Sequence, residues 1–140
     1  MPVAFRFFRS AVAFAVLGLS LGLYMALGHD HAQIPTHVHL LMIGWVSMFL
    51  FGAFYALVPA AAGRAALVQW WLANTGVAVM IPGLWLIFAG TPQIGGPVAT
   101  LGALVVFAAM LTFAGIVWWM TMARHGAATS RPAGPGATIR

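Results

Sequence analysis

Four long apolar segments, separated by short connections, are the feature that most constrains this chain. They cover residues 5–27, 36–59, 67–89 and 98–123. Each is long enough to cross the hydrocarbon core of a bilayer as a helix, which takes about 20 residues. Because the connections are short, consecutive segments are expected to lie beside one another and run in opposite directions. The sequence therefore predicts an all-α integral membrane protein built as an antiparallel bundle of four transmembrane helices.

The composition agrees with a membrane protein and narrows its chemistry. Of the 140 residues, 63% are hydrophobic and 5% are charged, and the mean hydropathy is +1.00. The absence of cysteine excludes disulfides, thiolate chemistry, iron–sulfur clusters and covalent attachment of c-type haem. Glutamate and lysine are absent too, and the only acidic residue is Asp30, so no hydrolytic or phosphoryl-transfer site is expected. Histidine remains as the strong ligand for a redox cofactor.

The arginines predict the orientation in the membrane. Arg6 and Arg9 precede or open the first apolar segment, Arg64 lies between the second and third, and Arg124 follows the fourth. In a four-span protein all of these positions fall on one side, and basic residues favour the cytoplasmic side. We therefore expect a multi-pass protein of the inner (plasma) membrane with both termini in the cytoplasm. The basic residues mark topology and do not indicate a nucleic-acid partner.

The chain is expected to form one folded unit. Residues 1–125 are predicted to be the transmembrane domain, and residues 126–140, rich in glycine, alanine and proline without periodicity, to be a flexible cytoplasmic tail. An alternative for the N-terminus is a cleaved signal peptide, since two arginines stand before or at the start of an apolar run. That run is long for a signal peptide, so we expect it to stay as the first helix.

Two histidines open the second apolar segment. His37 and His39 lie two residues apart, which on an α-helix is a rotation of about 200°, so their side chains point to nearly opposite sides. They are poorly placed to chelate one metal together, and the spacing predicts one site on each flank of the helix. The simpler alternative is that both are interfacial histidines that only reach headgroup water. Ionisable residues within a span are nevertheless functional by default.

The remaining histidines carry weaker predictions. His29 and His31 flank Asp30 in the preceding loop, for which a solvated connection is the simpler interpretation. In a functional interpretation they would contact the acidic edge of a bound cofactor. His125 follows the fourth segment and is assigned no role.

The string HVHLLMIGWVSMFLFGAFYALVP, residues 37–59, resembles the second helix of the catalytic subunit (subunit I) of the haem-copper oxidase superfamily. The likeness is strongest to the nitric oxide reductase and cbb-type oxidase branches, where a haem-ligating histidine opens a helix that closes with an aromatic pair and a Val-Pro-like end. Here His37 and the Phe54 to Pro59 end occupy those places. The string VQWWLANTGVAVMIPGLW, residues 68–85, is similar to the third helix of the same subunits.

This resemblance implies a fold and a cofactor. The family's subunit is described as three four-helix arcs, so this chain would be one arc, one third of the subunit, and three copies would rebuild the whole. A His-x-His in the family ligates two haems on its two sides, which implies that His37 and His39 are haem iron ligands. We therefore expect a membrane b-type haem protein, a homo-oligomer and most plausibly a trimer, with bis-histidine haem at the subunit interfaces. His29 and His31 would then contact haem propionates.

Several features of the family are missing from the sequence. There is no adjacent His-His pair for copper, no histidine with a tyrosine four residues on, and no glutamate for a proton path. Electron transfer, or redox or gas sensing, with a redox partner or quinol, is thus expected rather than a complete oxidase. Three alternatives stay open: a copper- or zinc-handling membrane protein, a structural or assembly subunit without a cofactor, and an active gas reductase.

Overall fold

The computed structural model describes residues 1–129, with side chains through Met122, and this part of the chain is helical without strands. Its elements are α1 (Val3–Gly28), α2 (Ile34–His39), a π-helix η1 (Leu40–Ser47), α3 (Met48–Leu57), a 3-10 turn η2 (Pro59–Ala61), α4 (Arg64–Phe88) and α5 (Pro92–Thr129). Since α2, η1 and α3 follow one another without a break, they form one span. Four spans of the described chain are long and apolar enough to cross a membrane, as predicted.

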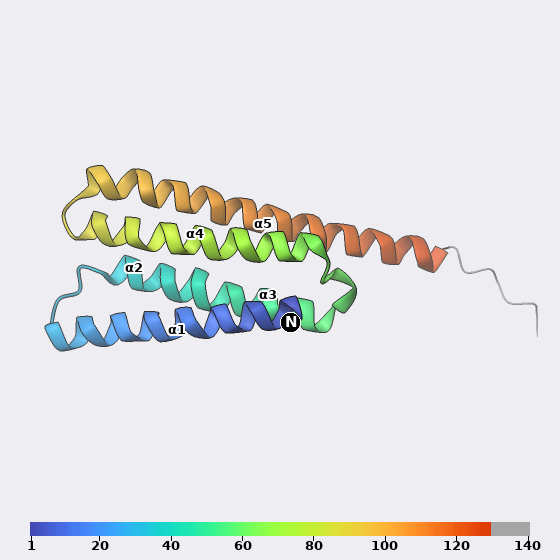
Figure 1. The fold of residues 1–140 in the computed structure, drawn as a ribbon, viewed down its shortest axis with the longest axis horizontal. Coiled ribbons are helices and arrows are strands. Elements are labelled where there is room, and N and C mark those ends of the chain that lie inside the picture. Colours follow the sequence, from blue (N-terminus) through green and yellow to red (C-terminus); the bar gives the residue numbers. More distant parts are fainter. Residues whose placement is uncertain (130–140) are drawn as a thin grey trace, which may run out of the picture.

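The helices lie side by side in two pairs (Figure 1). One pair is α1 with the α2–η1–α3 span, and the other is α4 with α5. The α1–α2 and α4–α5 connections lie at one end of the bundle, and the α3–α4 connection lies at the other (Figure 1). We call the first the histidine end, since it holds His29 to His39, and the second the arginine end, since α4 begins there with Arg64.

Local chemistry explains where these helices end. After Gly28 the chain enters the left-handed region at His29 (φ 51°), a conformation that stops a helix. The carboxylate of Asp30 then accepts a hydrogen bond from the Ala32 amide at 2.9 Å, which closes a tight turn before α2. At the arginine end, Val58 leaves the helical region (φ −126°, ψ 70°) because the residue before a proline avoids it.

The fourth span starts earlier than the sequence predicted. Residues 90–97 were expected to form a loop, yet α5 begins at Pro92. The carbonyl of Thr91 accepts hydrogen bonds from the amides of Ile94 (3.2 Å) and Gly95 (3.0 Å), and a proline in the first turn loses no helical hydrogen bond. The helix also continues to Thr129, past the predicted start of the tail at 126. The rest of that predicted tail, residues 130–140, lies outside the described residues.

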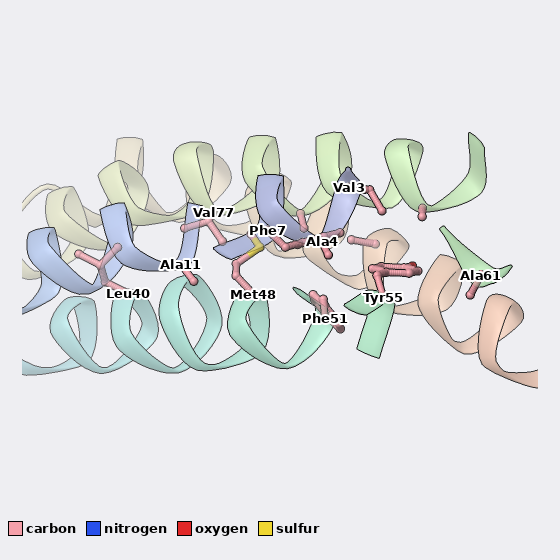
Figure 2. Close-up of a cluster of buried hydrophobic side chains, with 13 residues drawn as sticks. Val3, Ala4, Phe7, Ala11, Leu40, Met48, Phe51, Tyr55, Ala61 and Val77 are labelled. Atoms are coloured by element: carbon pink, nitrogen blue, oxygen red, sulfur yellow. The ribbon is translucent and has the colours of Figure 1, made fainter. Parts of the chain in front are cut away.

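The core is a cluster of buried hydrophobic side chains between the helices (Figure 2), and aromatic rings gather in its part toward the arginine end. Phe7 of α1 packs against Phe51 and Tyr55 of α3 with ring centroids 5.6 Å apart in both cases. Phe113 of α5 joins at 4.7 Å from Phe51. Rings in such edge-on and stacked contacts stabilise a fold by about 0.5–1.5 kcal/mol per pair beyond their burial. This cluster therefore connects the two helix pairs.

The outer surface of the bundle is apolar. Large side chains such as Leu19, Leu23, Leu50, Leu101 and Leu104 are each more than half exposed. A soluble domain rarely exposes so continuous an apolar surface. The pattern fits helices whose outer faces contact lipid.

Candidate functional site

The start of α2 is fastened to the end of α4. Gln33, which precedes α2, donates from Nε2 to the carbonyl of Trp85 at 3.2 Å. Its Oε1 accepts from the Thr36 hydroxyl at 2.7 Å, and both side chains are buried. Because buried polar groups are costly to leave unpaired, this network fixes the position of the first turn of α2, from which His37 and His39 project.

His37 lies against α1. Its Nδ1 is 2.9 Å from the carbonyl oxygen of Gly18. A methyl group added to Gly22 would meet His37 Cε1 at 2.9 Å, so the imidazole fills the space beside a glycine that has no side chain. The ring is half-buried.

His39 makes a local contact instead. Its Nδ1 is 2.7 Å from the carbonyl oxygen of Pro35, one turn earlier in the chain. Pro35 stands at the start of α2, and its carbonyl oxygen accepts a hydrogen bond from the His39 ring. His39 is half-buried as well.

These hydrogen bonds fix the protonation pattern of both rings. A carbonyl oxygen only accepts, so in each neutral imidazole Nδ1 carries the proton and Nε2 keeps a lone pair. Within the described part of the chain no residue makes a hydrogen bond to either Nε2. Metal-ligating histidines characteristically donate their other ring nitrogen to a carbonyl or carboxylate in this way. The donor set of His37 and His39 thus fits two imidazole ligands whose ring orientation is fixed by the backbone.

The two rings do not form one chelating site. His37 and His39 both lie within the α-helical turn Ile34–His39, where the two-residue spacing separates them by about 200°. No group of three histidine, aspartate or glutamate side chains suited to a metal ion occurs among the described residues. The helix geometry assumed from the sequence is present, and each imidazole faces its own flank.

The other histidines stand apart from this pair. His29, Asp30 and His31 are exposed in the α1–α2 connection. Apart from the Asp30 turn described above, their side chains make no hydrogen bond within the described residues. Their contact with a propionate stays a prediction. The side chain of His125 lies outside the described residues.

The π-helix directly after His39 was not foreseen. In η1 the Ser47 hydroxyl donates to the carbonyl of Met42, five residues earlier, at 2.9 Å. Wide turns of this kind inside α-helices are rare and occur often at functional sites. The run LLMIGWVS is apolar almost throughout, and no sequence signal distinguishes it from an ordinary α-helix.

Polar side chains at the arginine end are mostly paired within the chain. The Tyr55 hydroxyl of α3 donates to Gln69 Oε1 of α4 at 2.6 Å, a hydrogen bond between two helices. Asn74 donates to the carbonyl of Trp70 in its own helix at 2.8 Å. Trp70 in turn donates from its indole to Ser10 Oγ at 3.1 Å, while the guanidinium of Arg6 lies 5.5 Å from a ring centre of Trp70. These polar side chains are therefore held by contacts within the chain.

Two curated proteins share part of the sequence. The chain is 35% identical over 75 residues to "Cytochrome c oxidase subunit 1 homolog, bacteroid" of Bradyrhizobium diazoefficiens, covering 49% of this chain and 14% of that protein. It is also 35% identical over 68 residues to "Cbb3-type cytochrome c oxidase subunit CcoN1" of Stutzerimonas stutzeri, covering 44% of this chain and 14% of that protein.

Other comparisons return no match. No protein-family model matches the chain, and no solved structure matches it. The chain spans only 14% of the length of both curated relatives, so the similarity concerns a segment and not a whole oxidase subunit. The chain is thus similar to a segment of cytochrome oxidase subunit 1, and its four apolar helices are those of a multi-pass membrane protein.

Proposed function

We propose that this protein is a membrane b-type haem protein in which His37 and His39 each ligate a haem iron. The observation that carries the proposal is the state of the two imidazoles. Each gives its Nδ1 proton to a backbone carbonyl and keeps a free Nε2, and the two face opposite flanks of one helix. The partial similarity to cytochrome oxidase subunit 1 supports the same conclusion.

The opposite directions of the rings bear on assembly. One subunit cannot place both imidazoles on one iron, so a bis-histidine haem would take His37 from one subunit and His39 from its neighbour. Such a head-to-tail interface closes into a ring when repeated by rotation, and we propose a homotrimer. His29 and His31, exposed in the adjoining connection, would contact the propionates.

The proposed placement in the membrane follows the arginines. The antiparallel bundle would have both termini in the cytoplasm and the histidine end at the exterior side of the inner membrane. When bound, haem supplies one-electron chemistry at this end. His37 and His39 would hold it, and the carbonyls of Gly18 and Pro35 would keep the two imidazoles in their orientation. Electron transfer or redox sensing, with a redox partner or quinol, is the role we propose.

The direct test is the absorption spectrum of the purified protein, oxidised and reduced. We expect the Soret and alpha bands of a low-spin b-type haem in the native protein. These bands should be lost in His37→Ala and in His39→Ala but kept in the control variant His125→Ala, since that histidine is assigned no role. A colourless protein expressed with ample haem would refute the proposal, and bound copper or zinc without haem would favour metal handling instead.

Sharing between subunits has its own test. When the His37→Ala and His39→Ala chains are co-expressed in equal amounts, an interface that joins the two intact histidines should form in about one quarter of cases. Partial return of the haem bands in the mixed oligomer would support interface ligation. A monomer that still holds bis-histidine haem would contradict it.

A further inference from the structure

A groove at the arginine end has no assigned role. It lies between the α3–α4 connection and α5, with a volume of about 430 Å³. Gly63 and Arg64 form one side, and Ile116, Trp119 and Met120 form the other. A groove of this size is within the range of small-molecule sites, which is about 300–1,000 Å³.

The charged side of the groove has no counter-ion. Arg64 is exposed, and its guanidinium makes no ion pair or hydrogen bond to any described residue. The only acidic side chain of the whole sequence is Asp30, which lies in the α1–α2 connection at the opposite end of the bundle (Figure 1). The helix between these ends, α4, has 25 residues and is thus about 37 Å long. Asp30 cannot reach Arg64.

The other side of the groove is apolar and extends along α5. Gly115 and Trp119 line this groove and also a second hollow with Trp118 and Met122. Trp118 is 67% exposed and Met122 is 60% exposed. A cation beside an apolar groove that continues along α5 as far as Thr112, toward the middle of the span, matches a molecule with an anionic head and a hydrocarbon chain. Tryptophans at the level of the headgroups favour the same placement.

Three occupants of this groove can be compared by their charge: the chain's own last residues, a second copy of the chain, and an anionic phospholipid. Residues 123–140 bring three further arginines and no acidic side chain, so the chain's own end offers no carboxylate side chain to Arg64. A second copy, oriented in the same way in a bilayer, carries its Asp30 at the far end. Neither complements Arg64, whereas anionic phospholipids are abundant at a membrane surface and bind basic pockets between helices.

We propose that this groove is a binding site for an anionic phospholipid. The phosphate is bound by Arg64, whose planar guanidinium can donate two parallel hydrogen bonds to it. One acyl chain runs from Arg64 along Ile116 and Thr112 toward the middle of the bilayer. This site is independent of the haem proposal, since it lies at the other end of the bundle and uses none of the same residues.

The test is native mass spectrometry of the full chain with phosphatidylglycerol or phosphatidylcholine added. We expect a phosphatidylglycerol adduct that survives detergent removal and a weaker phosphatidylcholine adduct. In Arg64→Gln the affinity for phosphatidylglycerol should fall about five-fold, since one basic side chain near the surface contributes about 1 kcal/mol. The matched control is Arg6→Gln, because Arg6 is an arginine at the same end of the bundle that lies over the ring of Trp70 and does not line the groove. Equal loss in both variants would mean diffuse attraction and would overturn the site.

A second variant keeps the charge and fills the hollow. A methyl group added to Gly115 meets no atom within 4 Å, so Gly115→Leu can enter the groove without a clash and should reduce the adduct. Ala114→Leu, on the next residue and outside the groove, is its control and should leave the adduct unchanged. Equal adducts in Gly115→Leu and the native chain would overturn the acyl-chain path. Displacement of the lipid by millimolar inorganic phosphate would show a site for free phosphate and would overturn the lipid assignment.

Discussion

The two helix pairs of this bundle pack in different ways. Where α1 meets α2 and η1, the space beside a glycine is filled by a side chain of the other helix: His37 beside Gly22 and Phe14 beside Gly44. Where α4 meets α5, backbone meets backbone. A methyl group on Gly83 would lie 2.7 Å from Ala99 Cα, and one on Gly102 would lie 2.6 Å from Met80 Cβ and still closer to its backbone.

The two helix pairs therefore differ in how easily their contacts can adjust. Small residues let transmembrane helices approach closely, and such backbone contacts have little room to adjust. Side chains that fill a gap can change rotamer, so the first pair can reposition an imidazole without separating its helices. The α4–α5 pair therefore forms the rigid half of the molecule, and the α1–α2 pair carries the His37 and His39 imidazoles.

The largest effect should come from the rigid pair. Gly83→Ala should lower the free energy of unfolding by about 3 kcal/mol, because overpacking against backbone forces the helices apart. Thermal unfolding in detergent measures this. Gly96→Ala is the control, since a methyl group there meets nothing within 4 Å, and it should stabilise the helix by about 0.4–1 kcal/mol. If the two variants unfold alike, the close approach of α4 and α5 is wrong.

The buried pair Tyr55 and Gln69 should give the next largest effect. Both are at most 2% exposed, and the Gln69 Nε2 is already without a partner. Tyr55→Phe leaves the whole amide unpaired and should cost about 2 kcal/mol of unfolding free energy, within the penalty of about 1–3 kcal/mol for a lost buried partner.

The double variant of this pair supplies the control. Tyr55→Phe combined with Gln69→Leu removes every unpaired polar atom of the pair. It should recover most of the lost stability in the same unfolding measurement. A double variant less stable than Tyr55→Phe alone would show that the amide serves something other than this hydrogen bond.

A glycine of the first pair sharpens the comparison further. Gly22→Ala should cost only about 1 kcal/mol, since the imidazole of His37 can move aside, yet that motion should break its hydrogen bond to Gly18. Under the haem proposal, the variant loses or shifts the haem bands. Gly44→Ala, whose methyl group would meet Phe14 Cβ at 2.8 Å, should cost more, since a Cβ does not move with the rotamer, and should leave the spectrum unchanged. Identical spectra for both variants would contradict haem ligation by His37.

The smallest effect concerns the π-helix. Ser47→Ala removes the hydrogen bond to the carbonyl of Met42 and should reduce the unfolding free energy by about 0.5 kcal/mol. Thr112→Ala is the comparison, since its hydroxyl donates at 2.8 Å to the carbonyl of Ala108, four residues back in an ordinary α-helix. A larger loss at Ser47 would mark this hydroxyl as a determinant of the wide turn.

The sequence was sufficient for the four spans because apolar length alone decides them. The predicted loop was wrong at residues 92–97, where prolines and glycines favour a loop but α5 has already begun. There the helix persists because a proline can open it and because Gly95 packs against the backbone of Gly83 and Ile87, a contact between segments that local propensity does not contain. The opposite directions of His37 and His39 follow from helix geometry and were predictable. Their hydrogen bonds were not, because one of them depends on Gly18 in another helix.

The eight-residue η1 segment also affects the direction in which the imidazoles point around the helix axis. Each residue of an α-helix adds about 100° of rotation, and the wider turn of η1 adds less per residue. The π-helix thus sets the angle between the His37 and His39 flanks on one side and the Phe51 and Tyr55 face on the other. The π-helix therefore sets how far the two ends of one span are rotated relative to each other. One end carries the two histidines and the other carries the core aromatics, and η1 itself includes none of these residues.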